Sequence, residues 1–290
     1  MPVHYHILAM MLAKNKLNLV LCGFMSHVLV FDSGVGGLSV VAELRKLMPD
    51  LYMTYVADDA FRPYGEKTEA QLRTRLPGLL KTLVLTVNPD IVVIACNTAS
   101  TTALTEIRRA LDIPVIGVVP AVKPAAQMSQ SKSISVLGTP GTVRRKYVDK
   151  LIKEFSNNCQ VVLHGSTVLV NLAEQKLSGM KIDPHVIKAE VQPMFMAEGG
   201  DKIDVVVLAC THFPLLIDEL KSAAPKNVTW VDSGAAIAKR TQSVLERLSP
   251  NPTPNNPQTA LLIGNHNNAG IRSERRKMFA EFGFDKTVVL

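Results

Sequence analysis

The chain has 290 residues, of which 47% are hydrophobic and 20% charged, and it contains four cysteines. This composition is typical of a globular protein of one or two domains and excludes a small disulfide-stapled scaffold. The net charge of +7 comes from scattered Lys and Arg residues, and only 5% of the residues are aromatic. Nucleic-acid binding is therefore disfavoured as a main role, and a solvated basic surface or mild attraction of an anionic small substrate explains the charge better.

The first 27 residues form an N-terminal extension that precedes the regular pattern. Lys14 and Lys16 stand before a short apolar run at 17–22, which faintly resembles a secretory signal. The run contains Asn18 and ends in bulky residues, so we expect neither secretion nor membrane insertion. Met25 is an alternative start, which leaves residues 1–24 as a genuine extension or a start-site artefact.

Few free thiols in a long chain suit a reducing cytoplasm, the expected location.

From residue 28 onward, short aliphatic runs alternate with stretches of helical length, which predicts parallel βαβ units. We expect strands at 28–31, 53–57, 91–94, 114–118, 134–137, 161–163, 205–208, 229–231 and 261–263. We expect helices at 38–48, 69–87, 101–111, 142–155, 186–197 and 235–248, and a loop at 249–258.

One phrase occurs twice along the chain, as DIVVIACNT at 90–98 and DVVVLACTH at 204–212. Its aliphatic run is typical of a buried parallel strand. Ligands of open α/β sheets bind beyond the carboxyl ends of such strands, so each copy should bring one thiol to a site. A weaker echo, DSG at 32–34 and 232–234, is explained about equally well by chance. The predicted fold is α/β, with two similar open parallel-sheet lobes, helices on both faces and the active site in the cleft between them.

Polar residues follow both cysteines of the repeat: Asn97 and Thr98 after Cys96, and Thr211 and His212 after Cys210. A lone buried cysteine is commonly a small hydrophobic residue. A helix N-terminus favours the reactive thiolate, however, and an imidazole beside a thiol can move protons. Cys22 and Cys159 lack such neighbours and are expected to be inert. No cysteine or histidine pair has metal-ligand spacing, so we expect no metal.

The glycine-rich segment DSGVGG at 32–37 follows the first strand and opens a helix, where backbone amides can hold an anion. It is neither a dinucleotide fingerprint nor a phosphate loop, so its glycines are attributed to tight strand–helix packing. Asp32 and Ser33 are its functional candidates. The turn around Tyr64 indicates little by itself.

In this order, the motifs resemble those of the glutamate racemases, within the aspartate/glutamate racemase superfamily. Six blocks carry the resemblance: DSGVGG (32–37), PYG (63–65), CNTAS (96–100), TPGT (139–142), CTHFP (210–214) and VDSGAA (231–236). The resemblance extends from about Val28 to the C-terminus. It implies a cofactor-independent enzyme that supplies D-glutamate for bacterial peptidoglycan.

The resemblance also implies residue roles. Cys96 would deprotonate D-glutamate and Cys210 L-glutamate, with Asp32, His212 and Glu174 as further catalytic residues. Substrate contacts would come from Asp32, Ser33, Tyr64, Gly65, Asn97, Thr98, Thr211 and His212. Asp59 and Arg62 receive no role.

We expect Cys96 in a first lobe of residues 28–120 plus 235–290, and Cys210 in a second of residues 121–234. A homodimer and activation by a peptidoglycan precursor are further expectations. Two alternatives stay open: a racemase for another amino acid such as aspartate, and a non-catalytic partner-binding protein on the same fold.

Overall fold

The computed structural model describes residues 26–225, 227–248, 258–264 and 269–290. The strands are β1 (His27–Asp32), β2 (Tyr52–Ala57), β3 (Ile91–Ile94), β4 (Val115–Gly117), β5 (Ser133–Gly138), β6 (Gln160–Gly165), β7 (Val205–Ala209), β8 (Thr229–Val231), β9 (Thr259–Leu262) and β10 (Lys286–Val289). The helices are α2 (Leu38–Leu47), α3 (Glu69–Val87), α4 (Asn97–Ala110), α5 (Val122–Met128), α6 (Pro140–Val143), α7 (Lys146–Phe155), α8 (Val168–Leu177), α9 (Pro184–Met196), α10 (Ile217–Ala223), α11 (Gly234–Leu245) and α12 (Ala269–Glu281). Short 3₁₀ turns are η1 (Asp59–Phe61), η2 (Tyr64–Glu66), η3 (Gly200–Lys202) and η4 (Phe213–Leu216).

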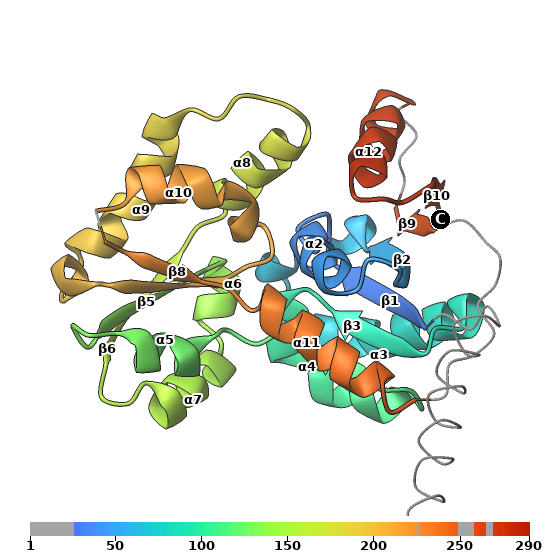
Figure 1. The fold of residues 1–290 in the computed structure, drawn as a ribbon, viewed down its shortest axis with the longest axis horizontal. Coiled ribbons are helices and arrows are strands. Elements are labelled where there is room, and N and C mark those ends of the chain that lie inside the picture. Colours follow the sequence, from blue (N-terminus) through green and yellow to red (C-terminus); the bar gives the residue numbers. More distant parts are fainter. Residues whose placement is uncertain (1–25, 226, 249–257, 265–268) are drawn as a thin grey trace, which may run out of the picture.

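The described strands form two parallel sheets that lie in two lobes (Figure 1). The larger sheet has the order β10-β9-β2-β1-β3-β4, and the smaller one has the order β6-β5-β7-β8. Helices cover both faces of each sheet, so the predicted two-lobe α/β fold is confirmed. No helix in the described part of the chain is long and apolar enough to cross a membrane.

Alternating side chains of β1 divide the larger lobe into two cores. Val28 and Val30 face a core completed by α2, α11 and α12. Leu29 and Phe31 face the opposite core, completed by α3 and α4. Successive strand residues point to opposite faces, and a strand covered on both sides is therefore apolar at every position. This explains why the run at 28–31 is continuously hydrophobic.

The smaller lobe is built in the same way around β5 and β7. Val206 and Leu208 pack with α8, α9 and α10, whereas Val205 and Val207 pack with α5. Figure 1 shows α5 and α7 on one side of this sheet and α9 and α10 on the other. Because both sheets are parallel, each lobe presents the carboxyl ends of its strands at a single edge.

Two predicted helices were wrong at their boundaries. The helix expected at 101–111 begins at Asn97, because the sulfur of Cys96 caps it by accepting the amide N–H of Ala99 at 3.4 Å. The helix expected at 142–155 is divided, because Arg145 is extended between α6 and α7. The Arg145 guanidinium donates to the carbonyl of Lys67 in the other lobe, so an interlobe contact interrupts the helix.

Other elements also depart from the sequence prediction. The strand expected at 261–263 begins at Thr259, and β10 follows α12 without having been predicted. The expected loop at 249–258 and the N-terminal extension fall almost wholly outside the described residues, although His27 already belongs to β1.

The acidic residue of each repeated phrase accepts hydrogen bonds at the start of its strand. The Asp90 carboxylate accepts the amide N–H of His27, the first residue of the neighbouring strand β1, at 2.7 Å. The Asp204 carboxylate accepts the Ser129 hydroxyl at 2.6 Å and the amides of Gln130 and Ser131 at 2.7 and 2.9 Å. Asp90 therefore joins the starts of β3 and β1, and Asp204 joins the start of β7 to the segment that leads into β5, so the repeat is also structural.

We predict that Asp204→Ala lowers the free energy of unfolding by about 1–3 kcal/mol, because the buried Ser129 hydroxyl loses its acceptor, together with the exposed amides of Gln130 and Ser131. Burial would raise the pKa of Asp204, but the hydrogen bonds from Ser129, Ser131 and Gln130 outweigh it and lower the pKa. This stabilisation is present above the ordinary carboxyl pKa and is lost as the pH falls through the lowered value. Urea unfolding measures the change, with exposed Asp201→Ala as control. Equal stability of the two variants would contradict the prediction.

Candidate active site

A cavity of about 370 Å³ lies where the two lobes meet. It is lined by Ser33, Gly34, Arg62, Pro63, Tyr64, Gly65, Glu66, Cys96, Asn97, Thr98, Thr139, Thr142, Thr167, Val170, Asn171, Glu174, Ala209, Cys210, Thr211 and His212. Both cysteines of the repeat therefore face one enclosed space, each from its own lobe. Every predicted site residue lines this cavity except Asp32, which is fully buried directly behind Ser33.

Cys96 stands between the end of β3 and the first turn of α4. Its sulfur accepts the Ala99 amide and lies 3.6 Å from the hydroxyl of Ser33. Burial raises the pKa of the Cys96 thiol well above its usual value, and the nearby charge of Asp32 raises it further. The amide of Ala99 and the hydroxyl of Ser33 act in the opposite direction but do not compensate. In this arrangement Cys96 is held as a protonated thiol.

Asp32 ends β1 and connects the two lobes. Its carboxylate accepts the amides of Ser33 at 2.8 Å and Gly37 at 2.5 Å, so it caps the turn that leads into α2. The hydroxyl of Thr211, in the second lobe, donates to the same carboxylate at 3.3 Å. Burial raises the pKa of Asp32 despite these donors and despite the nearby His212. A cationic group bound beside Asp32 would offset that cost.

Cys210 follows β7 and lies next to an imidazole. The Cys210 sulfur is 3.7 Å from Nδ1 of His212, and Nε2 of His212 is 3.5 Å from the carboxylate of Glu174. Burial by itself would lower the pKa of His212, but its polar interactions with Cys210 and with the Glu174 carboxylate raise it to about 10. The imidazole is thus held in its charged form, which stabilises negative charge on the adjacent sulfur.

Glu174 is ionised in spite of its partial burial. Desolvation would raise its pKa, but His212 and the guanidinium groups of Arg62 and Arg275 lower it to about 2. The resemblance implied a catalytic role for Glu174, and the structure places its carboxylate 3.5 Å from Nε2 of His212, a contact that was not predicted. Its helix α8 was not among the helices predicted from the sequence.

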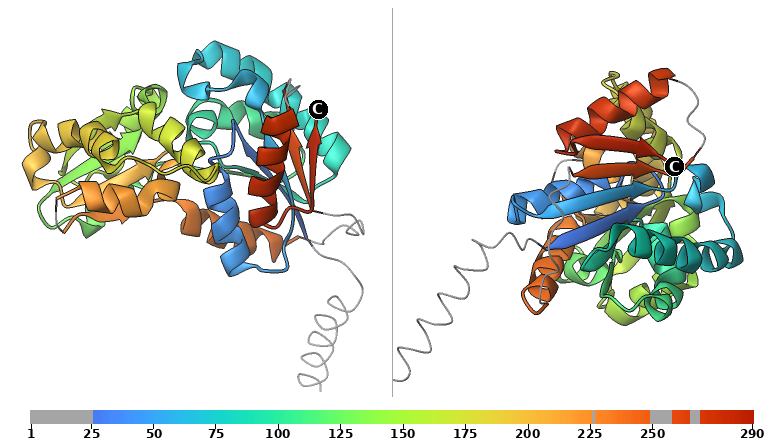
Figure 2. Two further views of the ribbon diagram at one scale, coloured as in Figure 1. Left: turned by 90° about the horizontal axis from the view of Figure 1, so that it is seen from above. Right: turned by 90° about the vertical axis from the view of Figure 1, so that its right-hand side faces the viewer.

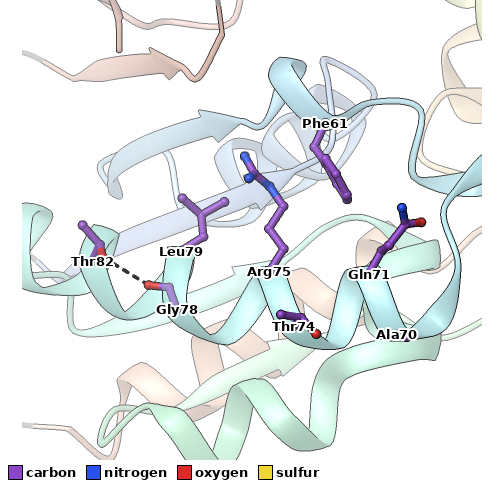
Figure 3. A pocket seen from close by; sticks show the side chains of 8 residues that line it. All are labelled: Phe61, Ala70, Gln71, Thr74, Arg75, Gly78, Leu79 and Thr82. Carbon is purple, nitrogen blue, oxygen red and sulfur yellow. Dashed lines mark hydrogen bonds between the residues drawn. The ribbon is translucent and has the colours of Figure 1, made fainter.

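The loop that carries Tyr64 and Gly65 is held by a buried charged network. The Tyr64 hydroxyl donates to Asp58 at 2.6 Å, and Arg75 donates to both oxygens of that carboxylate at 2.7 Å. Figure 3 shows Arg75 rising from α3 beside Phe61, whose ring centroid lies 4.8 Å from the guanidinium carbon. Because the Tyr64 hydroxyl already donates its hydrogen to Asp58, Tyr64 and Gly65 can offer hydrogen bonds to the cavity through their backbone groups.

The lobes also touch through small polar groups and glycines. The hydroxyl of Thr98 is hydrogen-bonded to that of Thr142 at 2.9 Å, which joins α4 to α6. A Cβ atom on Gly141 would overlap the carbonyl group of Gly65, so the backbones meet directly at this point. The PYG and TPGT blocks therefore meet in one contact, which requires that Gly141 has no side chain.

Several cavity residues were missed by the sequence prediction. Thr139 and Thr142 belong to a block already matched to the family, so the block was the available signal. Thr167, Val170 and Asn171 share one face of α8 with Glu174, since residues three, four and seven apart align on a helix. Helical spacing from Glu174 would have found them. Among the described residues, no group of three or more His, Cys, Asp and Glu side chains is arranged to hold a metal ion.

The chain belongs to the Asp/Glu/hydantoin racemase family, whose model matches residues 38–241. The resemblance seen in the sequence is thereby confirmed. The chain is 50% identical over 218 residues to the glutamate racemase of Shewanella sp. (strain MR-4), covering 75% of this chain and 79% of the relative. It is 47% identical over 220 residues to the glutamate racemase of Brucella anthropi, covering 76% and 79%.

The fold is also similar to solved structures. The crystal structure of Escherichia coli glutamate racemase, in complex with L-glutamate and the activator UDP-MurNAc-Ala, matches with a TM-score of 0.86 and 40% identity. The match covers 92% of this chain and 98% of the other. Glutamate racemase RacE1 from Bacillus anthracis matches with a TM-score of 0.70 and 26% identity, over 91% and 96% of the two chains.

We predict that Gly36→Ala lowers kcat/KM by about 100-fold, because small displacements of a site cost about that much. A Cβ atom at Gly36 would overlap Nδ1 of His212 and the hydroxyl of Thr211, so both residues must move. Gly78→Ala is the control, since Gly78 lies on α3 outside the cavity and its Cβ would meet no atom within 4 Å. Steady-state kinetics on both variants tests this, and an unaffected Gly36→Ala enzyme would refute it.

Proposed function

We propose that the protein interconverts L-glutamate and D-glutamate without a cofactor, using Cys96 and Cys210 as a pair of acid/base groups. The observation that carries this proposal is that both cysteines line one cavity, each from the corresponding strand end of a different lobe. Membership of the racemase family and the identity of its relatives support the reaction class.

Inversion of an amino acid requires removal of the α-proton from one face and delivery of a proton to the other. A single base returns its own proton to the face from which it came, so two groups are needed. A protonated thiol at Cys96 and a sulfur beside the His212 imidazolium meet this requirement, because one can donate while the other accepts. The roles exchange with the direction of reaction, with Cys96 acting on D-glutamate and Cys210 on L-glutamate.

The polar groups of the cavity support an amino acid with two carboxylates. Asp32 and the buried Oδ1 of Asn97, which has no hydrogen-bond partner among the described residues, are suited to the substrate ammonium. Hydroxyls of Ser33, Thr98 and Thr211 and the backbone of Tyr64 and Gly65 are suited to carboxylates. The volume is near the lower end of about 300–1,000 Å³ for ligand pockets, which favours a small substrate over a nucleotide.

Further parts of the proposal concern the cellular role. We propose that the product D-glutamate enters peptidoglycan synthesis, that the enzyme works in the cytoplasm as a homodimer, and that a peptidoglycan precursor activates it. The free state of Cys96, Cys159 and Cys210 supports a reducing compartment. The activator in the related Escherichia coli structure supports the regulation.

We also propose that the chain changes lobes near residues 120 and 234, giving lobes of residues 28–120 plus 235–290 and 121–234. The Ser233 hydroxyl donates to the carbonyl of Val119 at 2.7 Å, so the two crossings lie side by side. Packing of α11 against α2 supports its place in the first lobe.

We predict that turnover of L-glutamate in deuterated water places deuterium at the α-carbon of the D-glutamate formed, while the remaining L-glutamate gains little. Cys96→Ser and Cys210→Ser should each lower kcat by about 10²–10⁴-fold, the usual contribution of a positioned acid or base. Cys159→Ser is the control, because that buried thiol lies outside the cavity and contacts the carbonyl of Ala126. Mass spectrometry and chiral chromatography measure both effects.

Retained racemisation in either active-site variant, or inversion without solvent deuterium, would overturn the two-thiol mechanism. L-Aspartate should be inverted far more slowly than L-glutamate. Preferential turnover of aspartate would favour the racemase for another amino acid, and no turnover of any amino acid would favour a non-catalytic binding protein.

We predict that kcat/KM decreases as the pH rises through about 10, where His212 loses its charge. The sign follows from its raised pKa, since the stabilising imidazolium exists only below that value. The charged and titratable groups facing His212 are Cys210, Glu174 and Asp32. Glu174→Gln should move this limb to lower pH, whereas Glu219→Gln, in a surface ion pair with Lys176, should not. A pH profile of kcat/KM with an unshifted limb in Glu174→Gln would contradict the assignment.

A further inference from the structure

Four charged side chains meet at the edge of the cavity and form what we term the interlobe charge cluster: Asp59, Arg62, Glu174 and Arg275. Arg62 Nη1 donates to both oxygens of Glu174 at 2.8 Å, and Arg275 Nη2 donates to one of them at 3.4 Å. Asp59 lies 3.6 Å from Arg62 and 3.7 Å from Arg275. The two arginines thus share two carboxylates.

Members of the cluster come from different lobes. Arg62 follows η1, and Arg275 lies on α12, whose Met278 and Phe279 are buried in the core of the larger lobe. Figure 2 shows α12 lying along β9 and β10. Glu174 lies on α8 of the smaller lobe. The C-terminal helix therefore reaches a residue 101 positions earlier in the chain, across the junction of the lobes.

Burying charged side chains has an unfavourable free energy of desolvation, so a gain in stability alone does not explain this cluster. The side chains of Asp59 and Arg275 are only 2% and 9% exposed. The attraction within a buried ion pair hardly exceeds the free energy needed to desolvate its charges, and proteins with apolar replacements are often equally stable. Arginine remains charged at all relevant pH values and fixes a carboxylate through its planar donors. A functional role therefore explains the cluster better than a purely structural one.

The contacts that lead from Glu174 through His212 to Cys210 suggest what this function is. Glu174 lies 3.5 Å from Nε2 of His212, and Nδ1 of His212 lies 3.7 Å from the Cys210 sulfur. Glu174, His212 and Cys210 all belong to the smaller lobe, whereas both arginines belong to the larger one. The orientation of Glu174 toward His212 is therefore supported by groups of the other lobe.

We propose that Arg62 and Arg275 are positioning residues, which hold the Glu174 carboxylate against His212 and thereby organise Cys210 as a base only in the closed enzyme. The proposal rests on the proposed racemase function. Arg62 lines the cavity as well, so Arg275, which does not, is the cleaner probe of positioning. The charged groups that face Glu174 are Arg62, Arg275 and His212, with Asp59 behind the arginines.

The test compares Arg275→Gln, Arg275→Lys, Glu174→Gln and the double variant Arg275→Gln/Glu174→Gln. We expect Arg275→Gln to lower kcat/KM about tenfold, within the range of couplings between contacting groups, and Arg275→Lys to recover part of the loss. The double variant should be no worse than Glu174→Gln alone. The matched control is Arg276→Gln, an exposed arginine on the same helix, which should behave as the parent enzyme.

A pH profile separates positioning from simple electrostatics. Removing a positive charge alone would raise the pKa of His212 and move the alkaline limb of kcat/KM to higher pH. Loss of Glu174 orientation would lower that pKa and move the limb to lower pH, as in Glu174→Gln. A shift to higher pH, or additive losses in the double variant, would overturn the proposal.

Thiol alkylation provides a readout that does not depend on the substrate. Iodoacetamide labelling of the full-length protein, followed by peptide mass spectrometry, gives the Cys210 rate with Cys96 as internal reference. Arg275→Gln and Glu174→Gln should lower the ratio of Cys210 to Cys96 labelling to a similar extent, and Arg276→Gln should leave it unchanged. An unchanged ratio in Arg275→Gln refutes positioning even if racemisation is intact. A lowered ratio in a protein that fails to racemise glutamate supports positioning and rejects the proposed function instead.

Discussion

The carboxylate of Asp32 is the interaction on which the rest of the site depends. A fully buried carboxylate is tolerated only with donors around it, and here they come from the turn that begins α2 and from Thr211 across the junction. The same carboxylate raises the pKa of Cys96 and acts on His212. One buried charge thus holds the turn after β1, joins the lobes and influences both members of the proposed acid/base pair.

The two thiols occupy equivalent positions but different electrostatic surroundings. Cys96 lies beside a buried carboxylate and is held protonated, whereas Cys210 lies beside an imidazole whose pKa is raised to about 10. The proposed racemisation needs one group that accepts a proton and another that donates one, and two groups in identical surroundings would not provide this difference. Divergence of the residues after each cysteine, from Asn97-Thr98 to Thr211-His212, supplies the required inequality.

The strands and the thiol positions could be predicted because they depend on local patterns. An aliphatic run followed by a polar turn is sufficient to place Cys96 and Cys210 at strand ends. The start of α4 could not be predicted in this way, since its polar first turn is buried against the cavity rather than exposed as a loop. The break at Arg145 depends on a contact with Lys67, and Arg275 depends on Glu174, so neither has any local signature. Tertiary contacts between lobes are the part that pattern analysis could not reach.

The two sides of the cavity are closed by different kinds of contact. Near Cys96 the backbones of Gly65 and Gly141 meet directly and leave no space for a side chain, so this contact sets a fixed distance. Near Cys210 the lobes are joined by the ion pairs of Glu174 with Arg62 and Arg275, at 2.8 and 3.4 Å, whose partners regain hydration when they separate. Steric contact penalises overclosure, and the charged contacts are sensitive to incomplete closure. The ion pairs of Glu174 therefore make the Cys210 side of the proposed site depend on how the lobes meet, while the contact of Gly65 with Gly141 limits how closely they can meet.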